Sequence, residues 1–262
     1  MSYARVHEGL EGLKLMGMTR ILDSAIQRWS KGDRDVFALI EELISAEEKE
    51  REQKRYENAL KWSGFPYYKR IEEFDFSFQP SVDKRQIKEL ETMRFLYEKE
   101  NVVFLGPPGV GKTHLAVGLG IRAIEEGKKC YFVNAITLVD KLKKAFMDRT
   151  LERQMRFYKG IDLLIIDELG YLPLDGEGAK LFFELIAQRY EKKSIILTSN
   201  RGFTEWDKIF TDEVIATAIL DRLLHHCTIV NIRGKSYRLK ERKKEGLMRV
   251  NVLTERREDN VR

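Results

Sequence analysis

The sequence predicts an α/β fold in which a five-stranded parallel sheet follows a small module made only of helices. From residue 101 onward, short apolar runs alternate with longer segments of helical periodicity, a pattern typical of a parallel sheet covered on both faces. Before residue 65, apolar residues recur at helical spacing with almost no strand signal. The expected strands are 101–105, 129–133, 162–167, 194–199 and 228–232, with helices at 112–126, 137–158, 176–191 and 212–225.

Changes in composition divide the 262 residues into four parts. We expect a helical module over residues 1–64, which would serve partner docking or assembly, and an aromatic-rich linker over 65–80. The α/β core would occupy 81–240 and open with a helix capped by Ser81. A basic tail, 241–262, follows.

The basic residues of the chain are clustered, and its formal net charge is +5. Residues 233–262 contain 11 Lys or Arg against 5 Asp or Glu, and residues 140–160 contain 7 against 3. Such clusters are typical of nucleic-acid-binding surfaces, although a solvated face and a frayed tail would have the same composition. No run approaches the roughly 18 consecutive apolar residues of a membrane span. The two distant cysteines are typical of a reducing cytoplasm.

The segment after the first expected strand matches the phosphate-binding pattern G-x-x-x-x-G-K-[ST] and opens a helix. Glycines there let backbone N–H groups turn toward phosphates, and the start of the helix adds a favourable field. The lysine would reach the β- and γ-phosphates of ATP, and the threonine hydroxyl would bind Mg²⁺. The expected nucleotide-binding residues are Gly106, Pro107, Pro108, Gly109, Val110, Gly111, Lys112, Thr113 and His114.

Two acidic residues, Asp167 and Glu168, follow the apolar run LLII, at the edge of a parallel sheet where ligands bind. We expect Asp167 to hold Mg²⁺ and Glu168 to polarise the water that attacks the γ-phosphate. Asn200 ends the next apolar run and would help to position that water, although a turn residue before Gly202 would look the same.

Arg222 lies on an expected amphipathic helix and would reach the γ-phosphate of the nucleotide bound to a neighbouring subunit. The competing interpretation is an ion pair with Asp212 or Asp221. His225 and His226 are expected to be packing or surface residues, because no other ligand cluster accompanies them in the sequence.

Together these elements resemble the AAA+ ATPases, specifically their initiator and helicase-loader branch, over residues 75–240. The stretches LKLMGM, GPPGVGKTHLA, LLIIDELGYLPLD, SIILTSN, AILDRLLHH and GKSYRLKER are similar to the IstB-like ATP-binding proteins of insertion sequences, which resemble the DnaC helicase loader. The resemblance implies an AAA+ P-loop core that uses ATP and Mg²⁺. Arg238 matches a second sensor arginine. Only about thirty residues follow the last expected strand, too few for a full C-terminal lid domain.

The resemblance also implies a function, an ATP-dependent helper of transposition. Such a protein self-assembles on duplex DNA as a homo-oligomer with ATP between subunits, selects the target, and cooperates with a partner transposase. ATP hydrolysis then drives disassembly. This branch carries an extra helical segment after the second strand. The basic residues of that segment, which we expect to contact DNA phosphates, are Lys141, Lys143, Lys144, Arg149, Arg153 and Arg156.

Three other interpretations stay open from the sequence. A replicative helicase loader of the DnaC type would share the ATPase core and differ in its N-terminal module. A P-loop kinase would phosphorylate a small molecule and would need an acceptor pocket with an arginine-rich lid. A DNA-coating protein would use ATP only to join subunits. LKLMGM and GYLPLD favour the helper of transposition.

Overall fold

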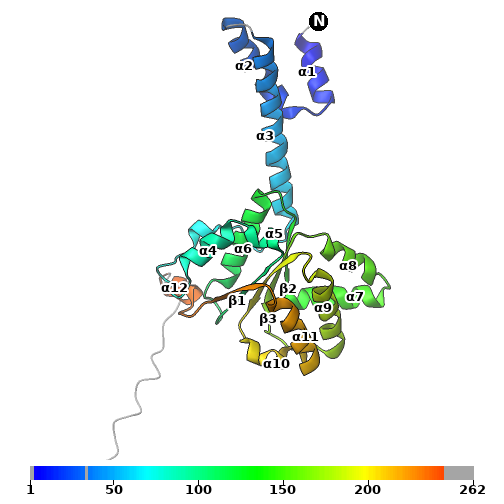
Figure 1. Cartoon of the computed structure of the whole chain (residues 1–262). Coiled ribbons are helices and arrows are strands. Elements are labelled where there is room, and N and C mark those ends of the chain that lie inside the picture. The colour runs from blue at the N-terminus through cyan, green and yellow to red at the C-terminus, as the bar shows by residue number, and fades with distance from the viewer. Residues whose placement is uncertain (1–2, 33–34, 245–262) are drawn as a thin grey trace, which may run out of the picture. The chain divides into compact units, whose positions relative to one another are not determined.

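The computed structural model describes residues 3–32 and 35–244, and it divides the chain into two compact units (Figure 1). The first unit is Met1–Trp62 and the second begins at Ser63. From residue 245 onward, the expected basic tail lies outside the described residues. Within the described ranges, no helix combines the length and the apolar composition needed to cross a membrane.

The first unit consists of α1 (Tyr3–Gly12), α2 (Met16–Lys31) and α3 (Val36–Trp62). The start of α2 lies directly against α3, because a Cβ on Gly17 would collide with the Ala46 carbonyl oxygen. The buried Glu47 of α3 accepts a hydrogen bond from the Gly17 amide at 2.7 Å. A carboxylate at this position satisfies an amide that the helix itself leaves unpaired. Hydrogen bonds from the Arg51 side chain and from the Gly17 and Met18 amides lower the pKa of Glu47.

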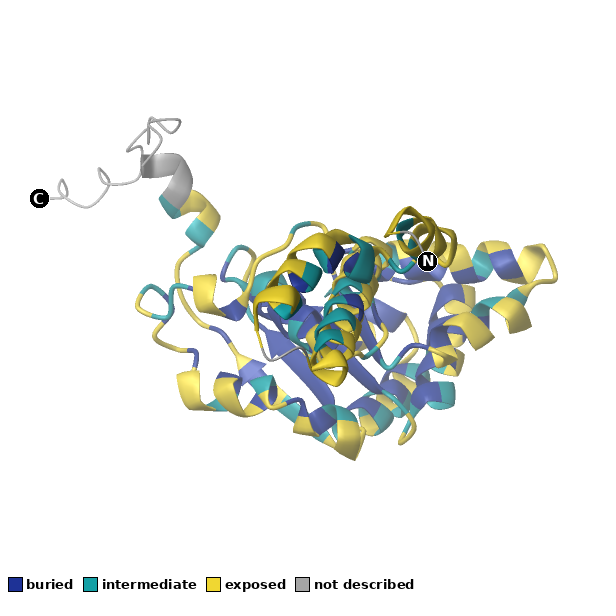
Figure 2. Ribbon diagram, turned by 90° about the horizontal axis from the view of Figure 1, so that it is seen from above, coloured by how far each residue is buried: buried dark blue, intermediate teal, exposed yellow. Residues whose placement is uncertain are grey.

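The second unit is built on five parallel strands in the order β2-β3-β4-β1-β5. The strands are β1 (Asn101–Leu105), β2 (Cys130–Asn134), β3 (Leu163–Leu169), β4 (Ser194–Ser199) and β5 (Cys227–Asn231). β1 and β4 have the predicted bounds, and the others differ by one or two residues. The prediction of a five-stranded parallel sheet is confirmed. β1, β3 and β4 are buried almost throughout. Figure 2 shows the middle of the sheet mostly in the dark blue of buried residues.

Helices cover both faces of the sheet. The second unit contains α4 (Lys84–Glu91), α5 (Arg94–Glu98), α6 (Lys112–Glu125), α7 (Ala135–Met147), α8 (Leu151–Lys159), α9 (Gly176–Arg189), α10 (Asp207–Phe210), α11 (Glu213–Leu224), α12 (Tyr237–Lys244) and the short 3-10 helices η1 (Ile71–Glu73) and η2 (Phe203–Glu205). Figure 1 shows α4 and α6 on one side of the sheet, with α7, α9 and α11 on the other. Alternate strand residues such as Val103, Leu164 and Leu197 form one core with α7, α9 and α11.

One helix expected as a single element is divided, and one predicted helix cap is wrong. The predicted helix 137–158 is α7 and α8, separated where Arg149 adopts a left-handed backbone with φ of 55°. A left-handed residue just after a helix ends it. The predicted cap Ser81 is also wrong, because Asp83 caps α4 by accepting from the Arg85 amide. The Ser81 hydroxyl instead accepts from the Arg233 amide at 2.8 Å.

Residues 65–80, expected as a linker, pack on the core instead. Phe65, Ile71 and Phe74 are buried. Two glycines of α6 make room for this segment, because a Cβ on Gly118 would lie 2.6 Å from Ile71 and one on Gly120 would lie 2.7 Å from Phe65. Burying these large apolar side chains against the glycines of α6 is favourable in free energy, whereas in a linker they would be exposed to water.

The buried Arg189 at the end of α9 ties together the segments that lead into β3 and β4. Its side chain is 1% exposed. It donates to the carbonyls of Tyr158 at 2.5 Å, Ile161 at 3.0 Å and Ser194 at 2.7 Å. Burial lowers the pKa of Arg189 to about 9. The guanidinium thus gives hydrogen bonds to buried carbonyls of α8, of the segment before β3 and of β4.

Substituting Arg189→Met should lower the free energy of unfolding by about 3 kcal/mol, since several buried acceptors would lose their donor. The measurement is urea unfolding followed by circular dichroism. The matched control is Lys193→Met, which removes the 40% exposed partner of Asp162 in the same region. That change should cost less than about 1 kcal/mol. Equal effects of the two substitutions would contradict the assignment.

Candidate nucleotide-binding and hydrolysis site

A cavity of about 270 Å³ lies at the carboxyl ends of the parallel strands. Its walls come from the phosphate-binding loop, the ends of β3 and β4, residues 67–79 and the start of α12. The predicted site residues that line it are Gly109, Val110, Gly111, Lys112, Thr113, His114, Glu168 and Arg238. Gly106, Pro107 and Pro108 belong to the same loop but are not among the lining residues. The structure therefore brings most of the predicted nucleotide site together.

The glycines of the loop are required by its backbone and by its neighbours. Gly109 and Gly111 have φ of 80° and 103°, values that other residues rarely adopt. A Cβ on Gly111 would lie 2.5 Å from the Phe74 ring, and one on Gly109 would collide with the Ser236 side chain. A loop with this conformation can turn its amides toward a phosphate. The conformation of the phosphate-binding loop therefore fits the triphosphate of ATP.

Lys112 begins α6 at the floor of the cavity and is 7% exposed. Its Nζ donates to the carbonyls of Gly106 at 2.7 Å and Pro107 at 2.9 Å, so the ammonium lies inside the curve of the loop. Burial lowers the pKa of Lys112 to about 8, against an opposing effect of the Asp167 carboxylate. A cation at this position is placed to meet a phosphate.

Asp167 is held beneath the cavity by two threonine hydroxyls. The Thr113 Oγ1 donates to its carboxylate at 3.0 Å, and the Thr198 Oγ1 donates at 2.5 Å. Burial raises the pKa of Asp167, and these hydrogen bonds act in the opposite direction. Hydroxyl and carboxylate oxygens are the ligands that Mg²⁺ prefers. The predicted pair Thr113 and Asp167 is thus together, and its chemistry fits magnesium.

An irregularity between β3 and β4 directs Glu168 into the cavity. Ile166 pairs with Leu197 and Leu169 with Ser199, so two residues of β3 face the single residue Thr198 of β4. Glu168 has φ of 62°, and its amide donates to the Thr198 Oγ1 at 3.0 Å. A bulge of this kind re-aims side chains, and bulges recur next to active sites.

The Glu168 carboxylate accepts a hydrogen bond from Asn134, a residue for which no role was predicted. Asn134 ends β2, and its Nδ2 donates to the Glu168 Oε2 at 2.6 Å. Its Oδ1 meanwhile accepts from the Ile136 amide and caps α7. Thr198 was missed as well. Both are polar residues at the carboxyl ends of apolar strands, the same signal that identified Asp167.

Asn200 and Arg222 are not among the residues that line the cavity. The buried Asn200 Oδ1 has no hydrogen-bond partner within the described part of the chain. Arg222 is partly buried on α11, where its Nη1 donates to the Ala218 carbonyl at 2.9 Å and its guanidinium lies 4.8 Å from the centre of the Phe183 ring. Asp212 caps α11, and no ion pair joins Arg222 to Asp212 or Asp221 among residues 35–244.

His114 supports the wall of the cavity. Its Nε2 lies 2.7 Å from the Arg70 carbonyl oxygen, and its ring packs edge-on against Phe74 with centroids 5.4 Å apart. Burial lowers the pKa of His114, which favours the neutral ring. This residue therefore joins residues 70–74 to the helix that follows the loop.

The basic residues of α7 and α8 do not form one uniform surface. Lys143 is paired with Asp175 at 2.5 Å, and Lys141 donates to the Tyr131 hydroxyl at 3.3 Å. The exposed members of the predicted set are Lys141, Lys144, Arg149, Arg153 and Arg156. A shallow groove of about 400 Å³ runs beside Lys141, Lys144 and Gln154.

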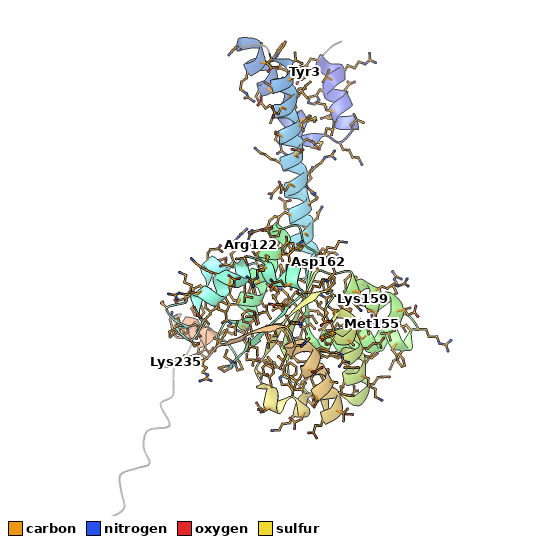
Figure 3. The ribbon with its side chains drawn as sticks, viewed as in Figure 1. Tyr3, Arg122, Met155, Lys159, Asp162 and Lys235 are labelled. Carbon is orange, nitrogen blue, oxygen red and sulfur yellow. The ribbon has the colours of Figure 1, made fainter. Side chains whose placement is uncertain are left out.

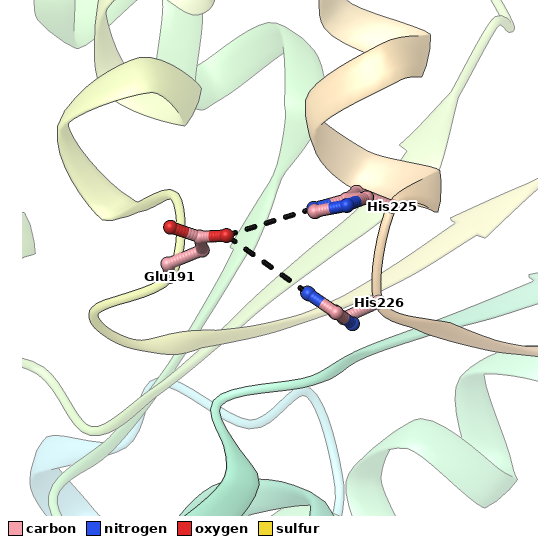
Figure 4. A group of neighbouring side chains, drawn as sticks. All are labelled: Glu191, His225 and His226. Carbon is pink, nitrogen blue, oxygen red and sulfur yellow. Dashed lines mark ion pairs between the residues drawn. The ribbon is translucent and has the colours of Figure 1, made fainter.

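Glu191, His225 and His226 form a group of three possible metal ligands (Figure 4). None of them lines the cavity. Glu191 Oε1 lies 3.6 Å from His225 Nδ1 and 3.9 Å from His226 Nε2. All three residues are exposed, and the Tyr190 hydroxyl lies 2.7 Å from His225 Nδ1. The expectation that no further ligand accompanies the two histidines is wrong, because the fold brings Glu191 beside them.

A family model described as IstB-like ATP binding protein matches residues 9–245. The chain belongs to this family. An ATP-binding protein of insertion sequence IS21 from Pseudomonas aeruginosa is 44% identical over 93% of this chain and 92% of its own length. One of insertion sequence IS232 from Bacillus thuringiensis subsp. berliner is 45% identical over 92% of this chain and 96% of its own.

Solved structures confirm the predicted fold of this IstB-like chain. AMPPCP-bound DnaA from Aquifex aeolicus has a TM-score of 0.52 at 24% identity, over 69% of this chain and 55% of that one. DnaI has a TM-score of 0.53 at 20% identity, over 63% of this chain and 90% of that one. The chain has an AAA+ P-loop core, binds ATP and is an ATPase, as the sequence predicted.

Substituting Thr198→Val should raise the Mg²⁺ concentration that ATP binding requires, because Asp167 and the Glu168 amide would both lose a hydrogen-bond partner. Removing an outer hydrogen bond of this kind typically lowers metal affinity by about 10- to 100-fold. The measurement is a Mg²⁺ titration of fluorescent ATP binding. Thr198→Ser retains the hydroxyl and should behave as the wild type. Wild-type Mg²⁺ dependence in Thr198→Val would contradict this role.

ATP binding should take up protons above pH 8 in wild-type protein. The pKa of Lys112 is about 8 before binding, and a bound polyphosphate stabilises the ammonium and raises that pKa. Since the charged lysine is disfavoured by folding, stability of the free protein should rise with pH from about 8 to about 10.5. Calorimetry at pH 8.5 in buffers of different ionisation enthalpy measures the uptake.

The control for this measurement is Lys112→Arg, whose guanidinium stays charged throughout the range. It should bind ATP without the extra proton uptake at pH 8.5. At pH 7 the lysine of the wild type is already charged, so uptake should be smaller there. Equal uptake at the two pH values, or in the two proteins, would contradict the assignment.

Proposed function

We propose that this chain is an ATP-dependent, DNA-binding helper of transposition that self-assembles on duplex DNA, selects the target and cooperates with a partner transposase. ATP hydrolysis would drive disassembly. One observation carries the proposal: Glu168, Lys112 and Thr113 line one cavity, whereas Arg222 lies on α11 and is not part of that lining. Because Arg222 does not line the cavity of its own chain, the Arg222 of a neighbouring subunit would supply the arginine that stabilises the transition state.

Hydrolysis would depend on residues already placed by the fold. Thr113 and Asp167 would hold Mg²⁺, which neutralises charge on the phosphates. Lys112 would bind the β- and γ-phosphates, and Glu168 would accept a proton from the attacking water. Asn134 holds the Glu168 carboxylate at 2.6 Å, so it orients this base. Asn200, whose Oδ1 has no partner among the described residues, would turn toward the water when the shared site forms.

DNA binding would involve the α7–α8 segment. Lys144, Arg149, Arg153 and Arg156 are exposed there and are available to phosphates, whereas Lys143 is already paired with Asp175. Contacts of this kind position a protein on duplex DNA without reading its sequence. The helices of the first unit would provide the transposase or assembly contact. Such a protein would act in the cytoplasm.

A helicase loader is the second candidate, because the fold is shared with DnaI. The names of the relatives, which are ATP-binding proteins of insertion sequences, support the transposition role instead. Affinity capture with purified transposase and purified replicative helicase separates the two. Retention of the helicase alone would favour the loader.

The test of the proposal is light scattering with ATP, with and without duplex DNA. Wild-type protein should form large assemblies that disperse as ATP is consumed. Glu168→Gln should form assemblies that persist, since the base is lost while binding remains. Arg222→Ala should bind ATP normally and lose at least about tenfold of the DNA-stimulated hydrolysis, because a trans arginine stabilises the transition state.

A mixing experiment provides the control for the shared site. Lys112→Ala lacks its own phosphate site but retains Arg222, and Arg222→Ala has the converse defect. Mixing the two should restore part of the hydrolysis that neither shows alone. DNA-stimulated hydrolysis at the wild-type rate by Arg222→Ala alone would overturn the shared site. Absence of ATP-dependent assembly in wild-type protein would overturn the function.

A further inference from the structure

Helix α12, the last helix that the structure describes, is attached to residues 75–81, and Asp75, Gln79 and Tyr237 of this attachment line the cavity. We call the four side chains at the centre of this attachment, Asp75, Phe78, Tyr237 and Lys240, the clasp. Lys240 Nζ donates to Asp75 Oδ2 at 3.0 Å and lies 4.1 Å from the centre of the Phe78 ring. The rings of Phe78 and Tyr237 pack edge-on at 5.4 Å. The ammonium therefore meets a carboxylate and aromatic faces together.

Asp75 is prepared for this contact by its own turn. Its Oδ1 accepts from the Ser77 hydroxyl at 2.5 Å and from the Phe78 amide at 3.0 Å. The Ser77 hydroxyl, followed by Lys240, lowers the pKa of Asp75 to about 2. The carboxylate is thus charged and oriented toward α12.

Two further bonds join the same segments before α12 begins. Gln79 Nε2 donates to the carbonyl of Lys235, which is labelled in Figure 3, at 2.8 Å. The Arg233 amide donates to Ser81 Oγ at 2.8 Å. Gly234 lies against Gln79 so closely that a Cβ would collide with its amide oxygen. The chain leading into α12 is therefore fixed along residues 79–81.

The start of α12 also rests on the phosphate-binding loop. The Tyr237 amide donates to the Gly109 carbonyl at 2.8 Å, and Ser236 occupies the space that a Gly109 side chain would need. Arg238 follows directly and lines the cavity. After burial and the Asp167 carboxylate, the charge of Arg238 is a further influence on the pKa of Lys112, and it acts to lower it. The positive charges of Lys112 and Arg238 therefore face the same cavity and repel each other. A bound polyphosphate would offset this repulsion.

Helix α12 has eight residues, Tyr237–Lys244, and a lone helix of this length is marginal in water. Its position must therefore come from tertiary contacts. The ion pair of the clasp joins α12 one turn beyond Tyr237, on the far side of Arg238 from the loop contact. Arg238 is thus held between two attachment points.

We propose that Asp75 and Lys240 are positioning residues that hold Arg238 over the bound nucleotide, so that the preference of this protein for ATP over ADP depends on their ion pair. The inference rests on the proposed use of the cavity for ATP. Without the clasp, the turn of α12 that follows Arg238 loses its attachment, and Arg238 is no longer held toward the terminal phosphate.

The experiment measures ATP and ADP dissociation constants on the full chain by competition with a fluorescent nucleotide, without DNA. Lys240→Met retains an unbranched apolar stem and removes the charge, and it should weaken ATP binding by about tenfold, the equivalent of one charged hydrogen bond. ADP binding should change by less than about twofold. Lys240→Arg should restore the preference. Lys193→Met, in the pair with Asp162, is the surface control and should change neither constant.

A double-mutant cycle separates positioning from general stability. If Lys240 acts through Arg238, Lys240→Met should add nothing to the loss caused by Arg238→Ala. Additive losses, or equal losses of ATP and ADP affinity, would overturn the proposal. Asp75→Asn should reproduce Lys240→Met, and thermal unfolding of both variants shows whether they are folded.

The outcomes for this proposal and for the proposed function are distinct. A wild-type protein that binds no ATP would overturn both. Normal ATP binding and DNA-dependent assembly, together with an unchanged ATP preference in Lys240→Met, would overturn the clasp alone. Loss of ATP preference in Lys240→Met, in a protein that does not assemble on DNA, would support the clasp and overturn the proposed function.

Discussion

The site depends on one buried carboxylate and the two hydroxyls that hold it. Asp167 lies beneath the cavity, bonded by Thr113 from α6 and by Thr198 from β4. Burying a carboxylate without hydrogen-bond partners would cost folding free energy, and the two hydroxyls offset that cost. The same two bonds connect α6 to the neighbouring strands β3 and β4. Because Thr198 also accepts from the Glu168 amide, the same hydroxyl sets the direction of the second acid. The proposed metal ligand and the proposed base are thus both held by the Thr198 hydroxyl.

The walls around this floor come from residues 67–79 and from the start of α12. Phe74 approaches Gly111 from one side, and Ser236 approaches Gly109 from the other. The glycines of the loop therefore serve the packing of the protein as well as the phosphates. This close approach lets a short segment and an eight-residue helix enclose a nucleotide cavity. The clasp then joins the two walls to each other beside the opening.

Much of the fold could be predicted because its signals are local. Apolar strands between polar turns and the glycine pattern of the loop placed β1, β4 and the start of α6 at the correct residues. The division at Arg149 could not be predicted, because a left-handed arginine leaves no compositional mark. The packing of 65–80 was missed for a related reason: the glycines that accommodate Phe65 and Ile71 lie some fifty residues away, in α6.

The sequence by itself determined the parallel sheet, the phosphate loop and the chemical types of the residues at the strand ends, since each follows from short-range pattern. Only the tertiary structure decided which of those residues meet. The bulge opposite Thr198 directs Glu168 toward Asn134, while the lining of the cavity includes Arg238 and excludes Arg222. Strand register and the packing of a distant helix set these contacts, and both depend on residues that are far apart in the chain.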